Sequence, residues 1–399
     1  MSRSVQRRTK RLHWWNRGSG IRLRIWMAVN VLLLATISYG VYAAVQTKAE
    51  GTSFAGLGVT PTAPGLLGRL GGGGAKPRNT VPDKSLFLDP KGVYFGAATP
   101  GAPYSSSEVS AVAAAAGGVR PTMTEFFVNW TQSFRPAMLT SAYDHGTLPV
   151  ISWEPWAGGQ ENNIGVGQVP KNNADQPKYR LANIIDGSFD SYITAFAQGV
   201  AAAKWPVALR FAHEMNGGWY PWSEKTNGNK AGQYVAAWRH VHDLFEKAGA
   251  TNVIWVWSPN IIRPVPHTKL SSLYPGDAYV DWVGLTGYGV RESTPATTFD
   301  PTLRQVRALT RKPILITETG AEPDHDKVSW VQSFFPWLKQ NRDVIGFVWT
   351  EKNKNSGALS DWRFDGDPRS EDAFQAGIST APLVTGLGSL TQPSSGSTR

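Results

Sequence analysis

The chain has 399 residues, of which 41% are hydrophobic and 18% are charged, so it can bury a large apolar core. It contains no cysteine, which excludes disulfides, thiolate zinc sites and cysteine nucleophiles. Of its 40 basic residues, nine lie in residues 1–48, which hold no acidic residue, and this leaves 31 basic against 30 acidic residues in the remainder. The near-neutral remainder argues against a nucleic-acid-binding surface.

Residues 25–45 form a run of 21 residues without a charged side chain. About 20 apolar residues in a helix span the bilayer core. Because the basic residues of 1–24 precede this run, we expect them in the cytoplasm and the bulk of the chain outside, on a single-pass anchor in the cell membrane. The alternative is a signal peptide cleaved near Val41-Tyr42-Ala43, which would release a secreted protein. Apolar regions of signal peptides usually run about 7–15 residues, which favours the anchor.

Residues 46–86 are rich in glycine, proline, threonine and alanine without a hydrophobic period, which predicts a flexible linker. Residues 386–399 are rich in serine, glycine and threonine, and we expect a disordered tail there. Residues 87–385 lie between them, and we expect this part to form one folded domain in a monomeric protein.

Strand-like and helix-like segments alternate along the predicted domain. Apolar runs of strand length lie at 93–99, 124–130, 149–156, 207–214, 252–258, 279–288, 313–318 and 344–351. Helical segments are expected at 105–116, 134–145, 189–204, 231–248, 301–310, 327–340 and 371–379. Eight strands separated mostly by helices predict a (β/α)8 TIM barrel. An open, doubly wound sheet is the alternative, although no glycine-rich phosphate-binding motif opens a strand-to-helix turn.

Acidic and aromatic side chains gather at the carboxyl ends of these predicted strands. The ends are Trp130, Trp153-Glu154-Pro155-Trp156, His213-Glu214, Trp257, Tyr288, Glu318 and Trp349-Thr350-Glu351. Active sites of TIM barrels lie at this rim. Carboxylic acids there can move protons, and aromatic rings stack on the apolar faces of pyranose rings. The pattern predicts a carbohydrate site, although any one of these aromatics taken alone is more often a core residue.

Glu214 and Glu318 are the pair of acids that we expect to act together. Ends of the fourth and seventh strands face each other across a barrel mouth, and a retaining glycosidase needs two carboxyl groups about 5–5.5 Å apart. Period-two alternation places Ala212 on the face of Glu214, and Ile316 on the face of Glu318. Each glutamate taken alone is equally well a polar strand end.

Three further polar residues at the rim have weaker signals. Glu154 and Glu351 are rival acids, but Pro155 and Lys352 follow them, which is typical of loop positions. His213 next to Glu214 has two interpretations, a ligand contact or a core histidine.

The sequence indicates neither a metal nor another cofactor, because no HExxH motif occurs.

Three segments resemble motifs of glycoside hydrolase family 26, a group of clan A barrels that includes β-mannanases, mixed-linkage β-glucanases and β-1,3-xylanases. The sequence RFAHEMNG at 210–217 is similar to the family's fourth-strand motif. The sequences ILITETG at 314–320 and VDWVGLTGYG at 280–289 resemble its seventh-strand and sixth-strand segments. The resemblance covers about 93–379, and the loops 157–181 and 352–367 have no match in it.

The resemblance implies a role for several of these residues. It implies that Glu214 is the acid/base, that Glu318 is the nucleophile and that Tyr288 hydrogen-bonds the nucleophile. It also places His213, Trp219 and Trp349 at substrate contacts, to which we add Trp153 and Trp222 from the aromatic rim.

We therefore expect a retaining endo-β-glycosidase that hydrolyses a β-1,4-linked mannan or a related β-glucan by double displacement. The expected partners are this polysaccharide and the membrane. The alternative is a non-catalytic polysaccharide-binding barrel that assists exopolysaccharide synthesis or export.

Overall fold

A computed structural model describes residues 81–158, 174–323 and 326–387. The predicted cytoplasmic segment and membrane anchor, and nearly all of the predicted linker and tail, lie outside these residues. Within the described ranges, no helix is both long and apolar enough to cross a membrane.

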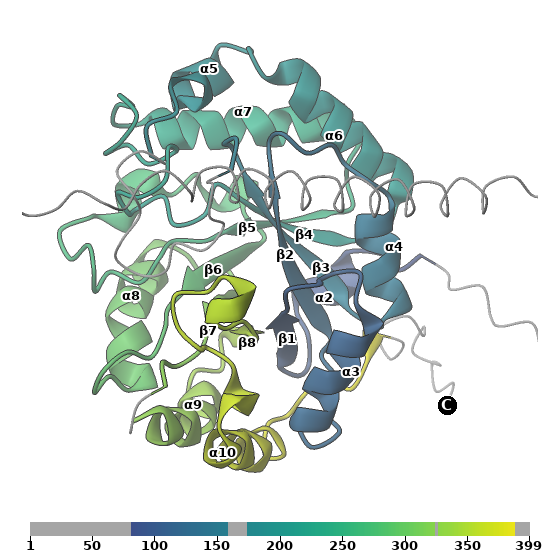
Figure 1. The fold of residues 1–399 in the computed structure, drawn as a ribbon. Coiled ribbons are helices and arrows are strands. Elements are labelled where there is room, and N and C mark those ends of the chain that lie inside the picture. Colours follow the sequence, from purple (N-terminus) through teal and green to yellow (C-terminus); the bar gives the residue numbers. More distant parts are fainter. Residues whose placement is uncertain (1–80, 159–173, 324–325, 388–399) are drawn as a thin grey trace, which may run out of the picture. The chain divides into compact units, whose positions relative to one another are not determined.

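Eight parallel strands form a closed barrel in sequence order, with β1 paired to β8. They are β1 (Tyr94–Ala98), β2 (Met123–Asn129), β3 (Leu148–Glu154), β4 (Val207–Phe211), β5 (Val253–Trp257), β6 (Trp282–Thr286), β7 (Ile314–Thr319) and β8 (Val344–Thr350). Figure 1 looks into the barrel and shows these strands at the centre. The predicted (β/α)8 barrel is confirmed.

Helices surround the strands on all sides in Figure 1. They are α2 (Ser85–Leu88), α3 (Ser106–Ala115), α4 (Ala137–Asp144), α5 (Leu181–Ile185), α6 (Asp190–Ala203), α7 (Gln233–Lys247), α8 (Pro295–Leu309), α9 (Lys327–Gln340) and α10 (Pro368–Ile378). Short 3-10 turns lie at η1 (Pro177–Tyr179), η2 (Leu270–Leu273), η3 (Asp277–Tyr279), η4 (Lys354–Ser356) and η5 (Phe364–Gly366).

Helix α8 begins six residues earlier than the predicted start at 301. Thr294 accepts a hydrogen bond from the Thr297 backbone N–H, and the Thr297 hydroxyl accepts one from the Thr294 N–H, which makes a capping box. Pro295 then occupies the first turn, where its missing N–H costs nothing. The prediction took Pro301 as a helix start, whereas this proline lies inside α8.

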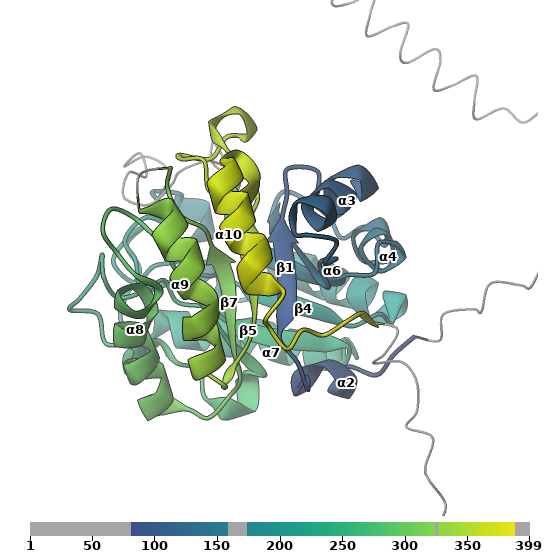
Figure 2. The same cartoon turned by 90° about the horizontal axis from the view of Figure 1, so that it is seen from below.

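The amino-terminal end of the barrel is closed by α2, which lies beneath the strands in the side view of Figure 2. Phe87 is fully buried in the same apolar cluster as Tyr94 and Trp282. The Tyr94 hydroxyl donates to the Phe87 carbonyl (3.1 Å), and the Trp282 indole donates to the Leu88 carbonyl (3.0 Å). Residues 85–86, which we assigned to the linker, therefore belong to the barrel domain.

Alternation along each strand divides the core into an inner and an outer layer, as β3 illustrates. Leu148 and Val150 face the barrel interior, whereas Ile151 and Trp153 face the surrounding helices. Further along β3, the inward Ser152 donates to a buried carboxylate. The interior thus changes from apolar to polar toward the carboxyl ends of the strands, where a TIM barrel carries its site.

Candidate active site

A layer of buried polar side chains lies below the barrel mouth, with Arg210 of β4 at its centre. Its Nη1 donates to Glu318 Oε1 (2.6 Å) and Glu125 Oε1 (3.1 Å). Nη1 also donates to Ser152 Oγ (2.9 Å), and Nε donates to Ser258 Oγ (2.9 Å). Burial disfavours the charge, but the carboxylates of Glu318 and Glu125 raise the pKa of Arg210 above its ordinary value. Arg210 is therefore a permanent cation in contact with Glu318, the acid of β7.

Both oxygens of the Glu318 side chain are held by donors. Oε1 accepts from Arg210, and Oε2 accepts from the Tyr288 hydroxyl (2.9 Å). The Tyr288 hydroxyl also lies 3.0 Å from Thr350 Oγ1, and the Trp362 ring packs on the Tyr288 ring with centroids 4.5 Å apart. A guanidinium compensates the charge of this carboxylate, and a phenol fixes its orientation, which suits a positioned nucleophile.

Glu214 occupies different surroundings in the turn that follows β4. Its backbone N–H donates to the Ser258 carbonyl (2.7 Å), and its Oε2 accepts from the Trp219 indole (2.6 Å). A Cβ at Gly217 would lie 2.5 Å from the Trp219 ring, so glycine permits this close approach. Burial, followed by the charge of Glu318, raises the pKa of Glu214 to about 7. Glu214 is therefore suited to donate a proton near neutral pH.

Both glutamates reach the mouth through irregular backbone, which corrects the predicted alternation. Ala212 (φ 45°) and Glu214 (φ 54°) have left-handed conformations, and Ala212 packs in the outer core. In β7 the register against β8 shifts between Ile316 and Thr319, as in a β-bulge, so Ile316 packs outward while Glu318 contacts Arg210 inside. The prediction of shared faces was wrong, because alternation ends where the ladder becomes irregular.

His213 is buried beside the mouth and supports its wall. Its Nε2 lies 3.3 Å from the Tyr220 hydroxyl and 4.0 Å from Glu154 Oε1. Burial, with the nearby charge of Arg210, holds the pKa of His213 well below its ordinary value, so the ring is neutral. Trp222 donates to the His213 carbonyl (2.6 Å) and stacks on Tyr220 with centroids 4.3 Å apart. Trp222, a predicted substrate contact, is fully buried in this role.

Two other predicted substrate contacts, Trp153 and Trp349, face away from the mouth. Trp153 packs on Phe196 with ring centroids 4.6 Å apart. Trp349 packs on Phe374 (5.1 Å), and its indole donates to the Trp362 carbonyl (2.9 Å). Both tryptophans are fully buried between the strands and the outer helices. These two predictions are corrected, because Trp153 in β3 and Trp349 in β8 occupy positions that point outward, where the aromatic rings pack against the surrounding helices.

A cavity of about 520 Å³ opens at the carboxyl ends of the strands, and Glu154, Tyr220, Tyr288 and Glu318 lie in its wall. Burial raises the pKa of Glu154 to about 8, so this rival acid is a neutral hydrogen-bonding group near pH 7. The other rival, Glu351, is buried outside the cavity lining and accepts from the Phe364 backbone N–H (3.1 Å).

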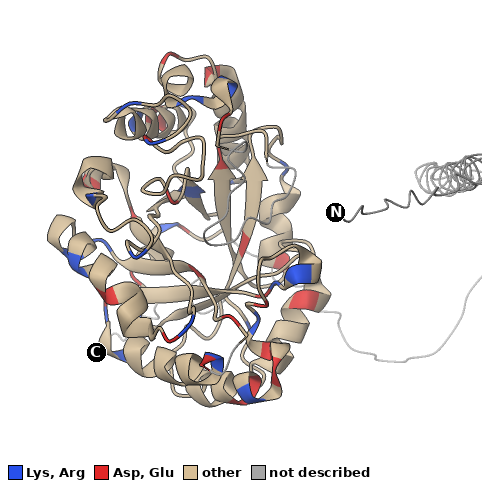
Figure 3. Cartoon of the chain, turned by 60° about the vertical axis from the view of Figure 1, so that its left-hand side comes forward, with Lys and Arg blue, Asp and Glu red and all other residues tan. Residues whose placement is uncertain are grey.

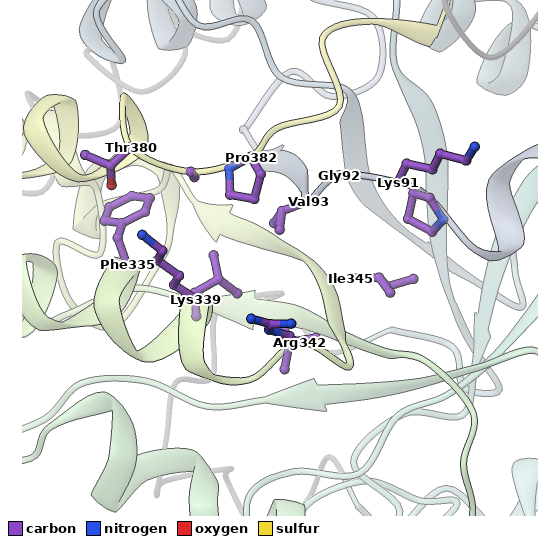
Figure 4. Close-up of a pocket in the computed structure, with 13 residues that line it drawn as sticks. Lys91, Gly92, Val93, Phe335, Lys339, Arg342, Ile345, Thr380 and Pro382 are labelled. Carbon is purple, nitrogen blue, oxygen red and sulfur yellow. The ribbon is translucent and has the colours of Figure 1, made fainter.

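Charged residues of both signs alternate over the barrel domain in the view of Figure 3. A second cavity, of about 350 Å³, lies at the amino-terminal end, where β1 and β8 begin. Figure 4 shows Lys91, Lys339 and Arg342 in its wall, and none of the described residues that line it carries a carboxyl side chain. It therefore lacks the acids that the mouth provides. Within the described ranges, no cluster of three or more histidine, aspartate or glutamate side chains is arranged to hold a metal ion.

Several residues of the mouth have no role in the sequence-based prediction. The sequence alone could have identified Arg210 and Glu125. Each is a charged residue inside an apolar strand, at a position that alternation turns toward the barrel interior. Tyr220 and Trp362 lie in loops, and their placement depends on tertiary contacts that no local pattern reveals.

The family model of glycosyl hydrolase family 26 matches residues 146–362, more than half of the chain, and this range includes Glu214 and Glu318.

Curated relatives share part of the chain. Endoglucanase H of Acetivibrio thermocellus is 33% identical over 288 residues, which cover 67% of this chain and 29% of the relative. A β-1,3-xylanase of a Vibrio species is 26% identical and covers 57% of this chain and 54% of its own length. A mannan endo-1,4-β-mannosidase of Bacillus subtilis is 25% identical and covers 55% of this chain and 62% of its own length. The chain thus spans less than two thirds of each of these relatives.

Solved structures share the fold at lower identity. The GH26 β-mannanase of Bacteroides ovatus has a TM-score of 0.56 and 19% identity, with 79% of this chain and 96% of that chain covered. The Bacillus subtilis mannanase man26 has a TM-score of 0.52 and 20% identity, with 74% and 88% covered. These neighbours agree with the barrel architecture.

Proposed function

Because the chain belongs to glycosyl hydrolase family 26, we propose that it is a retaining endo-β-glycosidase that cleaves a β-1,4-linked mannan or a related β-glucan. The observation that carries this proposal is the contrast between two carboxyl groups at the barrel mouth. Glu318 accepts hydrogen bonds from Arg210 and Tyr288, whereas burial raises the pKa of Glu214 to about 7. One group is arranged as a nucleophile and the other as a proton donor, and a non-catalytic binding barrel needs neither arrangement.

In the first step, Glu214 donates its proton to the glycosidic oxygen while a Glu318 oxygen attacks the anomeric carbon. The bond to the leaving sugar breaks, and a covalent glycosyl-enzyme forms. Arg210 keeps the attacking carboxylate oriented, and Tyr288 holds its second oxygen. The aromatic wall of the cavity supplies the surface on which sugar rings stack.

In the second step, Glu214 takes a proton from water, and the water oxygen attacks the anomeric carbon and releases Glu318. The charge of Glu318 contributes to the raised pKa of Glu214, and this charge disappears in the ester intermediate. The pKa of Glu214 therefore falls once the intermediate has formed. The same residue then becomes the base that the second step needs.

The names of these relatives support a β-linked polysaccharide as the substrate class. They are an endoglucanase, a mannan endo-1,4-β-mannosidase and a β-1,3-xylanase. Among these the endoglucanase has the highest identity, 33%, which supports testing β-glucan beside β-mannan.

The test is a digestion of β-mannan, mixed-linkage β-glucan and β-1,3-xylan by the chain and by Glu214→Gln and Glu318→Gln variants. We expect each substitution to lower kcat by about 100- to 10,000-fold, because each removes one of the two groups that the chemistry needs. Glu351→Gln is the matched control, since it changes a buried glutamate whose Oε1 accepts from the Phe364 backbone N–H. Wild-type turnover by either mouth variant would refute the assignment.

A further inference from the structure

The cavity at the mouth continues beyond Glu318 to the loops that follow β1 and β2. Tyr104, from the first loop, and Arg135, from the second, lie in this outer part of the wall. Leu359, from the segment after β8, lines the same cavity. Tyr104 is 45% exposed and Leu359 is 40% exposed, which makes them two of the few large apolar side chains that the described residues leave accessible. Exposed apolar side chains inside a cleft are characteristic of a ligand surface.

Tyr104 is held in place by the turn that leads into α3. Its backbone N–H donates to the Gly101 carbonyl (2.8 Å), and the Gly101 N–H in turn donates to Glu108 Oε2 (2.8 Å). Ser105 then caps α3 by accepting from the Glu108 N–H (3.2 Å). The backbone that carries the ring is therefore fixed before any ligand arrives, so binding costs little conformational entropy.

Arg135 lies against this ring, with its guanidinium carbon 5.5 Å from the ring centroid of Tyr104. The side chain is exposed, and in the described part of the chain it has no ion-pair partner. The guanidinium N–H groups can donate hydrogen bonds beside an exposed aromatic ring. A flat apolar ring next to a fork of donors matches the two surfaces of a pyranose, an apolar C–H face and an edge of hydroxyl groups.

We propose that Tyr104 and Arg135 form an outer subsite that binds a pyranosyl unit of the polysaccharide remote from the bond that is cleaved. Tyr104 stacks on the sugar ring, and Arg135 donates hydrogen bonds to its hydroxyl groups. The inference rests on the proposed function, because it names an additional part of the same substrate. Its consequence is a dependence on chain length, since only longer oligosaccharides reach from the carboxyl pair to the outer subsite.

The experiment compares kcat/KM on tri- to hexasaccharides of β-1,4-mannan and of mixed-linkage β-glucan for the chain and for Tyr104→Ala and Arg135→Ala variants. We expect Tyr104→Ala to lower kcat/KM about tenfold on the longest substrate that the chain cleaves, and to change the trisaccharide value by less than about twofold. Tyr104→Phe keeps the ring and should retain the wild-type length dependence.

A matched pair elsewhere in the barrel provides the control. Arg239 lies 5.1 Å from the ring centroid of Tyr279, and neither residue lines the cavity. Arg239→Ala should leave the length dependence unchanged. Equal losses on short and long substrates in Tyr104→Ala would overturn the subsite.

A measurement of polysaccharide binding tests the outer subsite independently of the proposed hydrolysis. Mobility in gels that contain β-mannan or mixed-linkage β-glucan needs no catalysis, and we expect less retardation of Tyr104→Ala than of the wild-type chain. If the wild-type chain cleaves none of the oligosaccharides, the proposed function fails while the gel still tests the subsite. Equal mobility of the two proteins in every gel would overturn the subsite whether or not hydrolysis is seen.

Discussion

Glu214 and Glu318 are chemically identical side chains that their neighbours prepare for different tasks. Glu318 receives hydrogen bonds on both oxygens, from Arg210 and Tyr288. Glu214 receives one from the Trp219 indole, and burial raises its pKa to about 7. Environment rather than residue type thus separates an attacking carboxylate from a proton-donating carboxylic acid.

Replacement of Trp219 by phenylalanine tests the protonation of Glu214. The indole N–H stabilises the charged carboxylate and so lowers the pKa of Glu214. Without it the pKa rises, the protonated acid persists to higher pH, and the basic limb of the kcat/KM profile moves to higher pH. The measurement is this profile for the two proteins on the cleaved polymer.

The control for that profile is Trp222→Phe, because the Trp222 indole donates to a backbone carbonyl instead of a carboxylate. Its basic limb should stay at the wild-type pH. A basic limb that is unmoved, or that moves to lower pH, in Trp219→Phe would contradict the role given to Glu214.

At the scale of elements, the sequence predicts the strands and helices well and the orientation of strand-end residues less well. Apolar runs of strand length located all eight strands, since such runs are local signals. The inward turn of Glu214 depends on left-handed backbone at Ala212 and Glu214 itself, and that of Glu318 on a register shift. The outward burial of Trp153 depends on helices that pack against it later in the chain. These features arise from tertiary contacts, which a periodic pattern does not contain.

The segment after β8 contains a buried acid whose protonation affects stability. Burial, with the charge of Asp365, raises the pKa of Glu351 to about 8. A carboxyl group with a raised folded-state pKa favours the folded state at low pH, and this contribution is lost as the pH rises from its ordinary value to about 8. Glu351→Gln keeps an oxygen to accept from the Phe364 N–H but cannot ionise.

The Tm of Glu351→Gln should therefore match the wild-type Tm below the ordinary carboxyl pKa of 4.5, and should exceed it increasingly as the pH approaches 8. Thermal unfolding across this pH range measures the difference. Glu246→Gln, which changes an exposed glutamate on α7, is the surface control for the loss of one carboxyl group. A Tm difference of Glu351→Gln that does not grow with pH would argue against a protonated buried acid.

The N-terminal sequence combines basic residues at 1–24 with an uncharged, mostly apolar run at 25–45. We propose that residues 25–45 remain as an uncleaved membrane anchor and that the linker, shortened to residues 46–84, connects it to a catalytic domain outside the cell. Such a tether confines hydrolysis to polymers close to the cell surface.

Cell fractionation tests the anchor. The full chain should remain in the membrane pellet after a carbonate wash, and a variant without residues 1–46 should be soluble. The mass of the full chain in the membrane pellet should show that the basic residues of 1–24 are still present. If cells that express the full chain instead release a shortened protein into the medium, and its mass shows that it starts after Ala43, the N-terminal segment is a cleaved signal peptide.

The most direct test of the central mechanism is the anomeric form of the first product, followed by proton NMR during digestion of β-mannan and mixed-linkage β-glucan. Double displacement through Glu318 inverts the anomeric centre twice, so the β-anomer should appear first and the α-anomer only later by mutarotation. Initial release of the α-anomer would mean a single displacement and would contradict the assignment of Glu318 as the nucleophile.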